Sequence, residues 1–396
     1  MSANEPTAER QPEDGSERRP PGGGGPGGGA VGTPPPRGKL RVGVVFGGRS
    51  GEHEVSLASA ASVLAAIDRS RYDVVPIGIA KDGHWLVGGD PLRALAEAAG
   101  LPLALPPAPA TGATPARVQT AGGLPAGLAA RLDVVFPLLH GPYGEDGTVQ
   151  GLLELADLPY VGAGVLASAV GMDKATMKAV FRAHGLPIVP HLVVLRHEWT
   201  AGREAIAGRV ADELGFPCFV KPSNLGSSVG ISKVRAAPEL SGAVAAAFAH
   251  DRKILVERGV AGREVEVSVL GNDLPEASVP GEVLPGKDWY DYEAKYTEGI
   301  AKLLIPAPVS AGLVAEFRSL AVRAFRAVDA AGLARVDFFL EDEVRIWVNE
   351  INTIPGFTRT SAYPRLWEAS GLPYPRLVDR LIELALKRHA QKRGEG

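Results

Sequence analysis

The sequence of 396 residues has a single cysteine, Cys218, which excludes intramolecular disulfide bonds. It has no apolar run long enough to cross a bilayer, and its N-terminus lacks the hydrophobic segment of a signal peptide. The formal net charge is −3 and no basic run stands out, so neither nucleic acid nor a membrane surface is an expected partner. We therefore expect a soluble cytoplasmic protein with enough core for about two or three domains.

Two common nucleotide-binding signatures are also missing. The turn at 47–54 is not GxGxxG, which disfavours a dinucleotide site, and the turn at 222–230 is not GxxxxGK[ST], which excludes a P-loop. The second turn nevertheless follows Lys221, which leaves a predicted buried strand, and its small residues offer backbone donors to phosphate oxygens. The sequence therefore predicts a nucleotide-phosphate site in which a strand lysine lies beside a glycine-rich loop.

Two stretches have too few large apolar residues to build a packed core. Residues 1–38 consist mostly of Gly, Pro, Glu and Arg, and we expect a disordered tail. Residues 101–125 are rich in Ala, Pro and Gly, and we expect a surface insertion. Order begins with a strand at 40–46, a glycine turn and a helix at 55–67, which is the opening of a doubly wound α/β domain.

Charged residues follow strands at the edge where open α/β sheets bind ligands. Glu52 and Glu54 lie at the mouth of the first helix, where a carboxylate binds a cationic group or compensates the helix dipole, and for Glu54 we favour the dipole. His140 follows the strand predicted at 133–139 and enters a glycine-rich turn. A ligand contact and a ring satisfied by local hydrogen bonds are equally open for this histidine.

The most informative stretch is the β-hairpin predicted for residues 335–356. A turn at 342–343 would place Arg335 opposite Glu350, and it would place Asp337 on the same face and diagonal to Glu350. Most flanking residues are apolar, so these charged groups are expected to be half-buried and to need partners.

The return strand of this hairpin adds two oxygen-bearing side chains. Its alternation predicts Glu350 and Asn352 on one face together with Val344, Ile346 and Val348. Oxygen ligands of this kind suit Mg²⁺ beside substrate phosphates, whereas the alternative is a solvated face that carries an ion pair. We favour the metal site, and its predicted ligands are Asp337, Glu350 and Asn352.

Other segments complete the expected site. Predicted strands at 253–257 and 263–270 carry Glu257, Glu264 and Glu266, whose carboxylates could hold ribose hydroxyls or could face solvent. Residues 287–302 are aromatic and charged without a regular period, which favours a lid that docks over a site. Helices are predicted at 172–184, 313–331, 363–370 and 375–389.

The motifs of this chain occur in the order of a known family. They are GGRSGEHEVS at 47–56, HGPYGEDG at 140–147, MDK at 172–174, VKPSNLGSSVG at 220–230, DYEAKY at 291–296, RVDF at 335–338 and NEINTIPGFT at 349–358. Over about residues 39–390 the chain resembles the D-alanine–D-alanine ligases of the ATP-grasp superfamily. The resemblance implies an α/β three-domain ATP-grasp ligase, with an N-terminal domain at 39–162, a central domain at 163–256 and a C-terminal domain at 257–396.

The resemblance also implies a role for each matching residue. It assigns the metal to the three hairpin ligands, and the oxyanion to Arg335 and the Gly356 amide. It assigns the ammonium of the first amino acid to Glu52, which is linked through Ser227 to Tyr296, with His140 and Ser361 near the substrates. The nucleotide contacts it implies are Lys174, Lys221, Glu257, Arg258, Glu264 and Lys295.

The implied reaction is the ATP-dependent ligation of two D-alanines, through an acyl phosphate, for peptidoglycan synthesis. ATP and Mg²⁺, for which Mn²⁺ can substitute, are the implied cofactors, and a homodimer is the implied assembly. Another ATP-grasp carboxylate–amine ligase is the nearest alternative, but it has no reason to keep the motifs at 51–56, 140–147 and 293–296. A non-catalytic nucleotide-binding regulator would tolerate loss of Asp337 or Asn352, and both are present.

Overall fold

The computed structural model describes residues 38–103, 113–120, 122–226, 229–284 and 302–394. The predicted tail, the proposed lid and three predicted site residues, Ser227, Lys295 and Tyr296, lie outside the described residues. The chain divides into two units, residues 1–38 and residues 39–396, and the second unit is described below. No helix within the described ranges is long and apolar enough to span a membrane.

The N-terminal part of the second unit is built on a five-stranded sheet in the order β4-β3-β2-β1-β5. Its strands are β1 (Leu40–Gly47), β2 (Tyr72–Ile79), β3 (Trp85–Val87), β4 (Ala116–Val118) and β5 (Val134–Pro137). Its helices are α1 (His53–Ala66), α2 (Pro91–Ala98), α3 (Thr148–Leu155) and the short η1 (Ala129–Arg131). β1 pairs in parallel with β2 and β5, so the predicted strand–turn–helix opening is confirmed. Part of the predicted insertion forms the edge strand β4.

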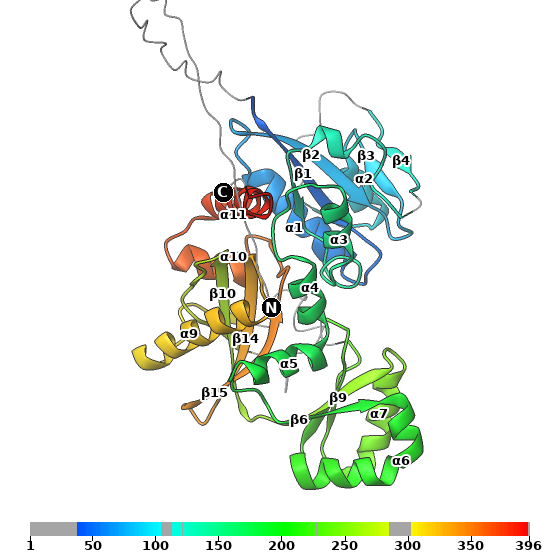
Figure 1. The fold of residues 1–396 in the computed structure, drawn as a ribbon, viewed down its shortest axis with the longest axis vertical. Helices are drawn as coiled ribbons and strands as arrows, with labels where there is room; N and C mark the ends of the chain where they lie inside the picture. Colours follow the sequence, from blue (N-terminus) through cyan, green and yellow to red (C-terminus); the bar gives the residue numbers. More distant parts are fainter. Residues whose placement is uncertain (1–37, 104–112, 121, 227–228, 285–301, 395–396) are drawn as a thin grey trace, which may run out of the picture. The chain divides into compact units, whose positions relative to one another are not determined.

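A four-stranded antiparallel sheet in the order β6-β9-β7-β8 follows (Figure 1). Its strands are β6 (His191–Leu195), β7 (Cys218–Pro222), β8 (Ser232–Val234) and β9 (Lys253–Arg258). Its helices are α6 (Arg196–Arg209) and α7 (Leu240–Phe248), with the short η2 (Val210–Leu214) and η3 (Ala237–Glu239). Cys218 is fully buried in the core of this sheet, as its apolar neighbours predict.

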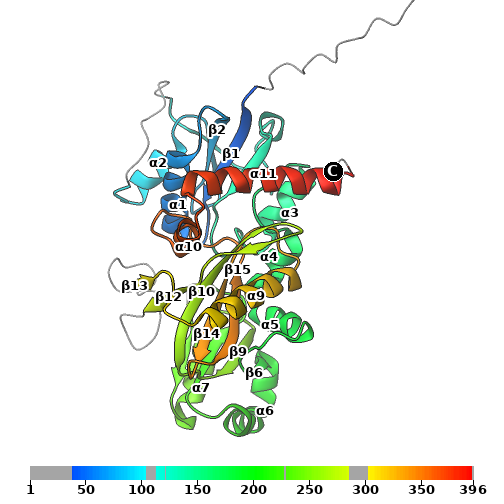
Figure 2. The ribbon, with the colours of Figure 1, turned by 90° about the vertical axis from the view of Figure 1, so that its left-hand side faces the viewer.

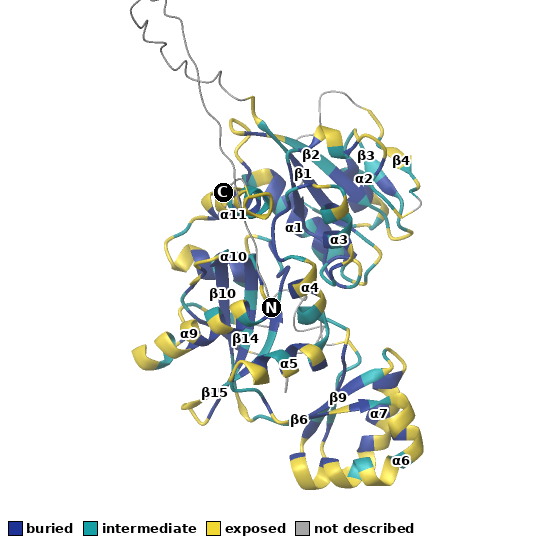
Figure 3. Cartoon of the chain, viewed as in Figure 1, coloured by how far each residue is buried: buried dark blue, intermediate teal, exposed yellow. Residues whose placement is uncertain are grey.

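A six-stranded sheet carries the predicted hairpin, and its main path is β13-β12-β10-β14-β15. Its strands are β10 (Gly262–Gly271), β11 (Glu276–Ala277), β12 (Gly281–Leu284), β13 (Lys302–Leu304), β14 (Gly332–Glu341) and β15 (Arg345–Asn352). The helices that pack in its core are α4 (Val165–Met172), α5 (Lys174–Ala183) and α9 (Ala311–Ala327). Figures 1 and 2 show α9 lying across β10 and β14, whose residues are mostly buried in Figure 3.

The hairpin prediction was right about the turn but wrong about the register. Asp342 and Glu343 both have positive φ, but Glu341 pairs with Arg345, so the loop is one residue longer than expected. A β-bulge at Asn349 adds a second shift. Together they place Asp337 opposite Glu350 and Arg335 opposite Asn352.

The bulge also corrects the predicted face of β15. Ile346 and Val348 are buried in the core under α9, and Val344 is 72% exposed in the turn. Glu350 and Asn352 lie on the opposite face, which they share with Asp337, because one extra residue reverses the alternation of side chains. The expected convergence of oxygen ligands is therefore reached by a different route.

Of the last two helices, α11 (Tyr374–Lys392) packs against β5 and α1, and α10 (Ala362–Ala369) packs against β10 and α11. They share one core with β1 and α1, and Phe357 lies at the centre of that core. The Phe357 ring is fully buried, with centroids 5.7 Å from Phe136, 5.7 Å from Tyr363 and 5.5 Å from Tyr374. The segment that follows β15 is therefore anchored in the N-terminal core.

We expect Phe357→Ala to lower the free energy of unfolding by about 3–5 kcal/mol, because it leaves a cavity among these rings. Urea denaturation followed by circular dichroism measures the change. Leu274→Ala is the control, since Leu274 is 82% exposed and an exposed substitution typically changes stability by less than about 0.5 kcal/mol. Equal stability of the two variants would contradict the anchoring role.

Candidate active site

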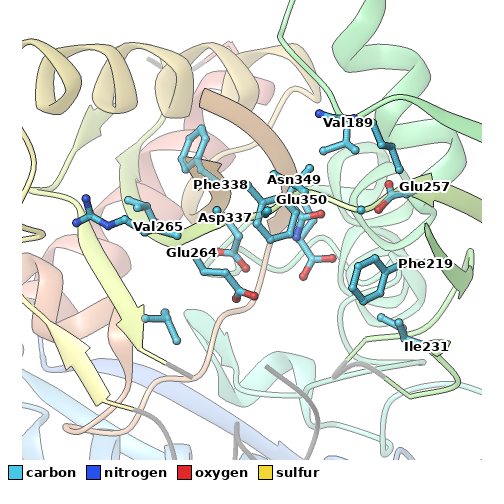
Figure 4. Close-up of a pocket in the computed structure, with 18 of the residues that line it drawn as sticks. Val189, Phe219, Ile231, Glu257, Glu264, Val265, Asp337, Phe338, Asn349 and Glu350 are labelled. Atoms are coloured by element: carbon cyan, nitrogen blue, oxygen red, sulfur yellow. The ribbon is translucent and has the colours of Figure 1, made fainter. Parts of the chain in front are cut away.

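A cavity of about 470 Å³ lies between the four-stranded and the six-stranded sheets. Several predicted site residues line it, and they are Lys174, Lys221, Glu257, Arg258, Glu264, Asp337 and Glu350. Figure 4 shows the carboxylates of Glu264, Asp337 and Glu350 on the side of the six-stranded sheet, with Phe219 and Ile231 across from them. A slot with an apolar wall, ammonium groups and carboxylates has the chemistry for a nucleotide, whose base is apolar on its faces and whose phosphates are anionic.

Two lysines hold the carboxylate of Glu257. β7 and β9 are paired strands, and they bring the Nζ of Lys221 into an ion pair with Glu257 Oε2. Lys178 approaches from α5, with its Nζ 2.8 Å from Glu257 Oε1. Burial by itself would raise the pKa of Glu257, but the two ammonium groups override it and hold this pKa well below its usual range.

Lys178 was missed by the sequence reasoning. Burial lowers the pKa of its ammonium more than the attraction of Glu257 raises it. The available signal was its spacing, because Lys178 follows Lys174 by four residues and both therefore lie on one face of α5.

Lys174 connects the glycine-rich loop to the hairpin. Its Nζ donates to the carbonyl oxygen of Leu225 at 2.7 Å and lies 3.5 Å from Glu350 Oε2. Asp173 fixes the start of α5, because its carboxylate accepts from the Thr176 amide at 2.9 Å as an N-cap. The MDK motif thus caps a helix and directs a cation into the cavity.

The acidic face of the hairpin is tightly paired. Arg335 donates to both carboxylate oxygens of Asp337, at 2.6 Å and 2.7 Å, and Asn352 Nδ2 donates to Asp337 Oδ2 at 3.0 Å. Glu266, from the neighbouring strand, lies 3.4 Å from Arg335 Nε. The side chains of Asp337, Arg335 and Glu350 are only 14%, 17% and 19% exposed, which disfavours the alternative of a solvated face.

The donor set of this face fits Mg²⁺. Asp337 and Glu350 are directly opposed carboxylates, and Asn352 adds an amide oxygen on the same face. Within the described ranges no group of three His, Cys, Asp or Glu side chains could hold a metal ion by itself. Two carboxylates that leave positions for phosphate oxygens are the usual arrangement for Mg²⁺, so a nucleotide would complete the coordination.

Glu52 and Glu54 lie in different surroundings at the start of α1. Glu54 forms an ion pair with Lys81 at 2.5 Å in the first turn of α1. Glu52 is the N-cap residue of α1 but its side chain makes no capping hydrogen bond. Its carboxylate instead lies against two glycines, because a Cβ would come within 2.8 Å of Glu52 Oε2 at Gly141 and within 3.6 Å at Gly226. These glycines leave room beside the carboxylate.

The ring of His140 is buried and hydrogen-bonded on both sides. Its Nδ1 lies 2.9 Å from the carbonyl oxygen of Ile354, and its Nε2 lies 3.3 Å from Ser59 Oγ. Burial lowers the pKa of His140 despite the opposing charge of Glu52, which favours a neutral ring that donates from Nδ1. Both hydrogen-bond partners come from distant segments and not from the local turn, so the ring links the turn after β5 to the segment after β15. The role of His140 toward a substrate stays a prediction.

The predicted oxyanion and substrate groups after β15 lie close together. A Cβ on Gly356 would come within 3.2 Å of Ser361 Oγ, so only glycine leaves this space open. Ser361 Oγ accepts from the Thr358 amide at 3.1 Å, which fixes its orientation at the start of α10. Their roles toward a substrate stay predictions.

Glu145 is a second residue, after Lys178, that the sequence reasoning missed. Its Oε1 lies 3.6 Å from the Cβ position of Gly226, on the same loop that Glu52 approaches. Burial, and then the nearby charge of Glu52, raise the pKa of Glu145 to about 8, although Lys174 opposes the shift. The HGPYGEDG motif contained the signal, because it places this acid five residues after His140.

The raised pKa of Glu145 predicts a pH-dependent stability. The ordinary pKa of a glutamate side chain is 4.5, so between about pH 4.5 and pH 8 the folded protein retains a proton that the unfolded chain releases. Stability therefore falls as pH rises through this window. We expect Glu145→Gln to gain melting temperature relative to wild type between pH 5 and pH 8, as followed by differential scanning fluorimetry. A difference that does not change with pH would contradict the assignment.

Comparison with known families covers most of the chain. Residues 41–163 match the model described as D-ala D-ala ligase N-terminus, and residues 180–383 match D-ala D-ala ligase C-terminus. A D-alanine–D-alanine ligase from Heliobacterium modesticaldum is 52% identical over 359 residues, which are 89% of this chain and 96% of that relative. A D-alanine–D-alanine ligase from Arthrobacter sp. is 52% identical over 370 residues, which are 90% and 96% of the two chains.

Solved structures give the same likeness. The D-alanine–D-alanine ligase from Coxiella burnetii has a TM-score of 0.76 and 38% identity over 90% of this chain and 96% of that chain. The D-Ala:D-Ser ligase VanG from Enterococcus faecalis has a TM-score of 0.75 and 33% identity over 88% and 100%. The mixed α/β architecture is therefore that of the ATP-grasp fold, as the motifs predicted.

Proposed function

Because the chain belongs to the D-alanine–D-alanine ligase family, we propose that it joins two D-alanines to D-alanyl-D-alanine and converts ATP to ADP and phosphate. The dipeptide serves peptidoglycan precursor synthesis, and we assign the reaction to the cytoplasm, where ATP is available. The observation that carries this proposal is the cavity in which Lys174, Lys221 and the acidic face of the hairpin come together.

The nucleotide is proposed to lie in this cavity. Its base would contact the apolar wall that includes Phe219 and Ile231, and its phosphates would lie near Lys221 and Lys174. Glu264 and Glu257 are the proposed ribose acceptors. Glu257 can serve although both its oxygens are ion-paired, because each carboxylate oxygen has two lone pairs.

The hairpin would hold Mg²⁺ or Mn²⁺. Asp337, Glu350 and Asn352 are the residues that would bind the ion, which when bound would neutralise phosphate charge. The Arg335 guanidinium pairs with the Asp337 carboxylate, and Glu266 lies on its other side. These two contacts would hold the guanidinium beside the proposed phosphate site.

The proposed chemistry has two displacements. The carboxylate of the first D-alanine attacks the γ-phosphorus and gives an acyl phosphate, and Glu52 would bind its ammonium. The amine of the second D-alanine then attacks the acyl carbon, loses a proton and displaces phosphate. Arg335 and the Gly356 amide would stabilise the oxyanion that forms, which is typically worth about 3–4 kcal/mol. The lid predicted at 287–302 would exclude water from the acyl phosphate.

The second substrate is proposed to be an amine. The resemblance implies that a tyrosine at position 296 goes with amine nucleophiles, and D-alanine–D-alanine ligases are about half identical to this chain. Ser227 and Tyr296 would link the lid to Glu52 in the closed state. D-Lactate is therefore expected to be a poor second substrate near neutral pH.

We expect the purified protein with ATP, Mg²⁺ and D-alanine to release phosphate and to form the dipeptide, with little ester when D-lactate competes. Mass spectrometry of the products measures both.

Glu350→Gln should reduce turnover by orders of magnitude, because it removes a carboxylate charge beside the phosphates. Glu343→Gln, in the exposed turn of the same hairpin, is the matched control and should retain activity. Near-normal turnover of Glu350→Gln at saturating Mg²⁺ would refute the metal-ligand role of Glu350. Mostly ester product from the wild type would refute the preference for an amine as second substrate.

We also propose that the protein is a homodimer. Its family resemblance implies this, and it is supported by apolar side chains exposed on α3, α4 and the turn before α3: Tyr143, Leu155, Val165 and Leu166. Sedimentation velocity should give a dimer for the wild type and a monomer for Leu155→Glu/Leu166→Glu, whereas Leu274→Glu, elsewhere on the surface, should stay dimeric. A monomeric wild type would refute the proposal.

A further inference from the structure

Lys178 is a buried cation that does not line the cavity. Its residue is 1% exposed, whereas Lys174 and Lys221 both line the cavity. A buried ammonium is costly unless it is paired and hydrogen-bonded. Lys178 has two such partners, Glu257 Oε1 at 2.8 Å and the carbonyl oxygen of Asn349 at 3.0 Å. One side chain of α5 therefore contacts both β9 and β15.

Asn349, whose carbonyl accepts from Lys178, is the residue that forms the bulge in β15. Asp337 pairs with Glu350 and Phe338 pairs with Val348, so Asn349 has no opposite residue on β14. A carbonyl in the interior needs a hydrogen-bond donor, and the Lys178 ammonium donates to the carbonyl of this extra residue. The bulge in turn decides that Glu350 faces the cavity and not the core under α9.

The contact with Glu257 concerns the nucleotide end of the cavity. Lys221 and Lys178 bind different oxygens of the Glu257 carboxylate. Lys221 approaches from β7, and Lys178 approaches from α5. Lys221 lines the cavity, so its ammonium is the one that can turn toward a phosphate. Lys178 then still compensates the Glu257 charge, which would otherwise be left buried and unpaired.

We propose that Lys178 is a positioning residue that couples the nucleotide site to the metal-binding hairpin, by fixing the bulge at Asn349 and by holding Glu257 when Lys221 engages phosphate. The inference rests on the proposed nucleotide and metal site. It differs from a purely stabilising ion pair in one respect: loss of Lys178 changes how strongly Mg²⁺ enhances nucleotide binding, and not only how stable the fold is.

The test compares ADP binding with and without Mg²⁺ by isothermal titration calorimetry, for the wild type and for Lys178→Met. Second contacts that orient metal ligands typically change metal affinity by about 10–100-fold, so we expect the Mg²⁺ enhancement of ADP affinity to fall by at least about tenfold. Arg388→Met is the matched control. Arg388 is also a cation that donates to backbone carbonyls, those of Tyr160 and Gly162, but none of these residues lines the cavity. The Arg388→Met variant should be less stable than the wild type and should keep the wild-type Mg²⁺ enhancement of ADP affinity.

A second variant covers the case in which Lys178→Met does not fold. Lys178→Met/Glu257→Gln removes the Lys178 ammonium together with the Glu257 charge and leaves Lys221 beside an amide oxygen. The Asn349 carbonyl still lacks its donor, so the reduced Mg²⁺ enhancement should persist. Wild-type enhancement in either folded variant would overturn the proposal, as would failure of both variants to fold while Arg388→Met folds. A wild type that forms the dipeptide in the product assay keeps the proposed function intact whatever these variants do.

Discussion

The extra residue Asn349 in β15 decides on which face of the six-stranded sheet the last acidic side chains lie. Side chains of a strand alternate with a period of two, so a shift of one residue moves each of them to the other face. On one face α9 buries Ile346 and Val348 in an apolar core. On the other face Glu350 and Asn352 meet Asp337 beside the cavity. An unbroken ladder would direct the Glu350 carboxylate into the core under α9.

Charge in the cavity is organised around buried pairs. Glu257 is shared by two lysines, and Asp337 is shared by Arg335 and Asn352. Buried ion pairs contribute little net stability, because desolvation offsets much of their attraction. Their value here is geometric, since they hold cations and carboxylates close together before a substrate arrives. A site of this kind binds a polyanion with little reorganisation, which is the main requirement of phosphoryl transfer.

The stability of the N-terminal core and the geometry of the site share one segment. Gly356 offers its amide to the proposed oxyanion, and the next residue, Phe357, is fully buried among aromatic rings of the N-terminal core. The amide of Phe357 also donates to Ser59 Oγ at 3.3 Å, and Ser59 contacts the ring of His140. A change that loosens this core is therefore expected to displace the backbone amide that we propose as an oxyanion donor.

The sequence by itself determined the main elements, the turn at Asp342 and Glu343, and seven of the residues that line the cavity. These follow from local rules, namely the buried apolar run of β1, the alternation of β14, the small residues of the loop after Lys221, and the N-cap Asp173. Only the tertiary structure decided the hairpin register, because nothing in the alternation of β15 marks Asn349 as an extra residue.

Tertiary structure alone also decided the state of the buried titratable groups. The ring of His140 is hydrogen-bonded to distant segments and burial lowers its pKa, the pKa of Glu145 is raised to about 8, and Lys178 is buried between two strands. Each of these properties depends on which distant segments cover the side chain and which charges they bring. Burial and long-range partners are set by packing, and a local sequence pattern carries no information about them.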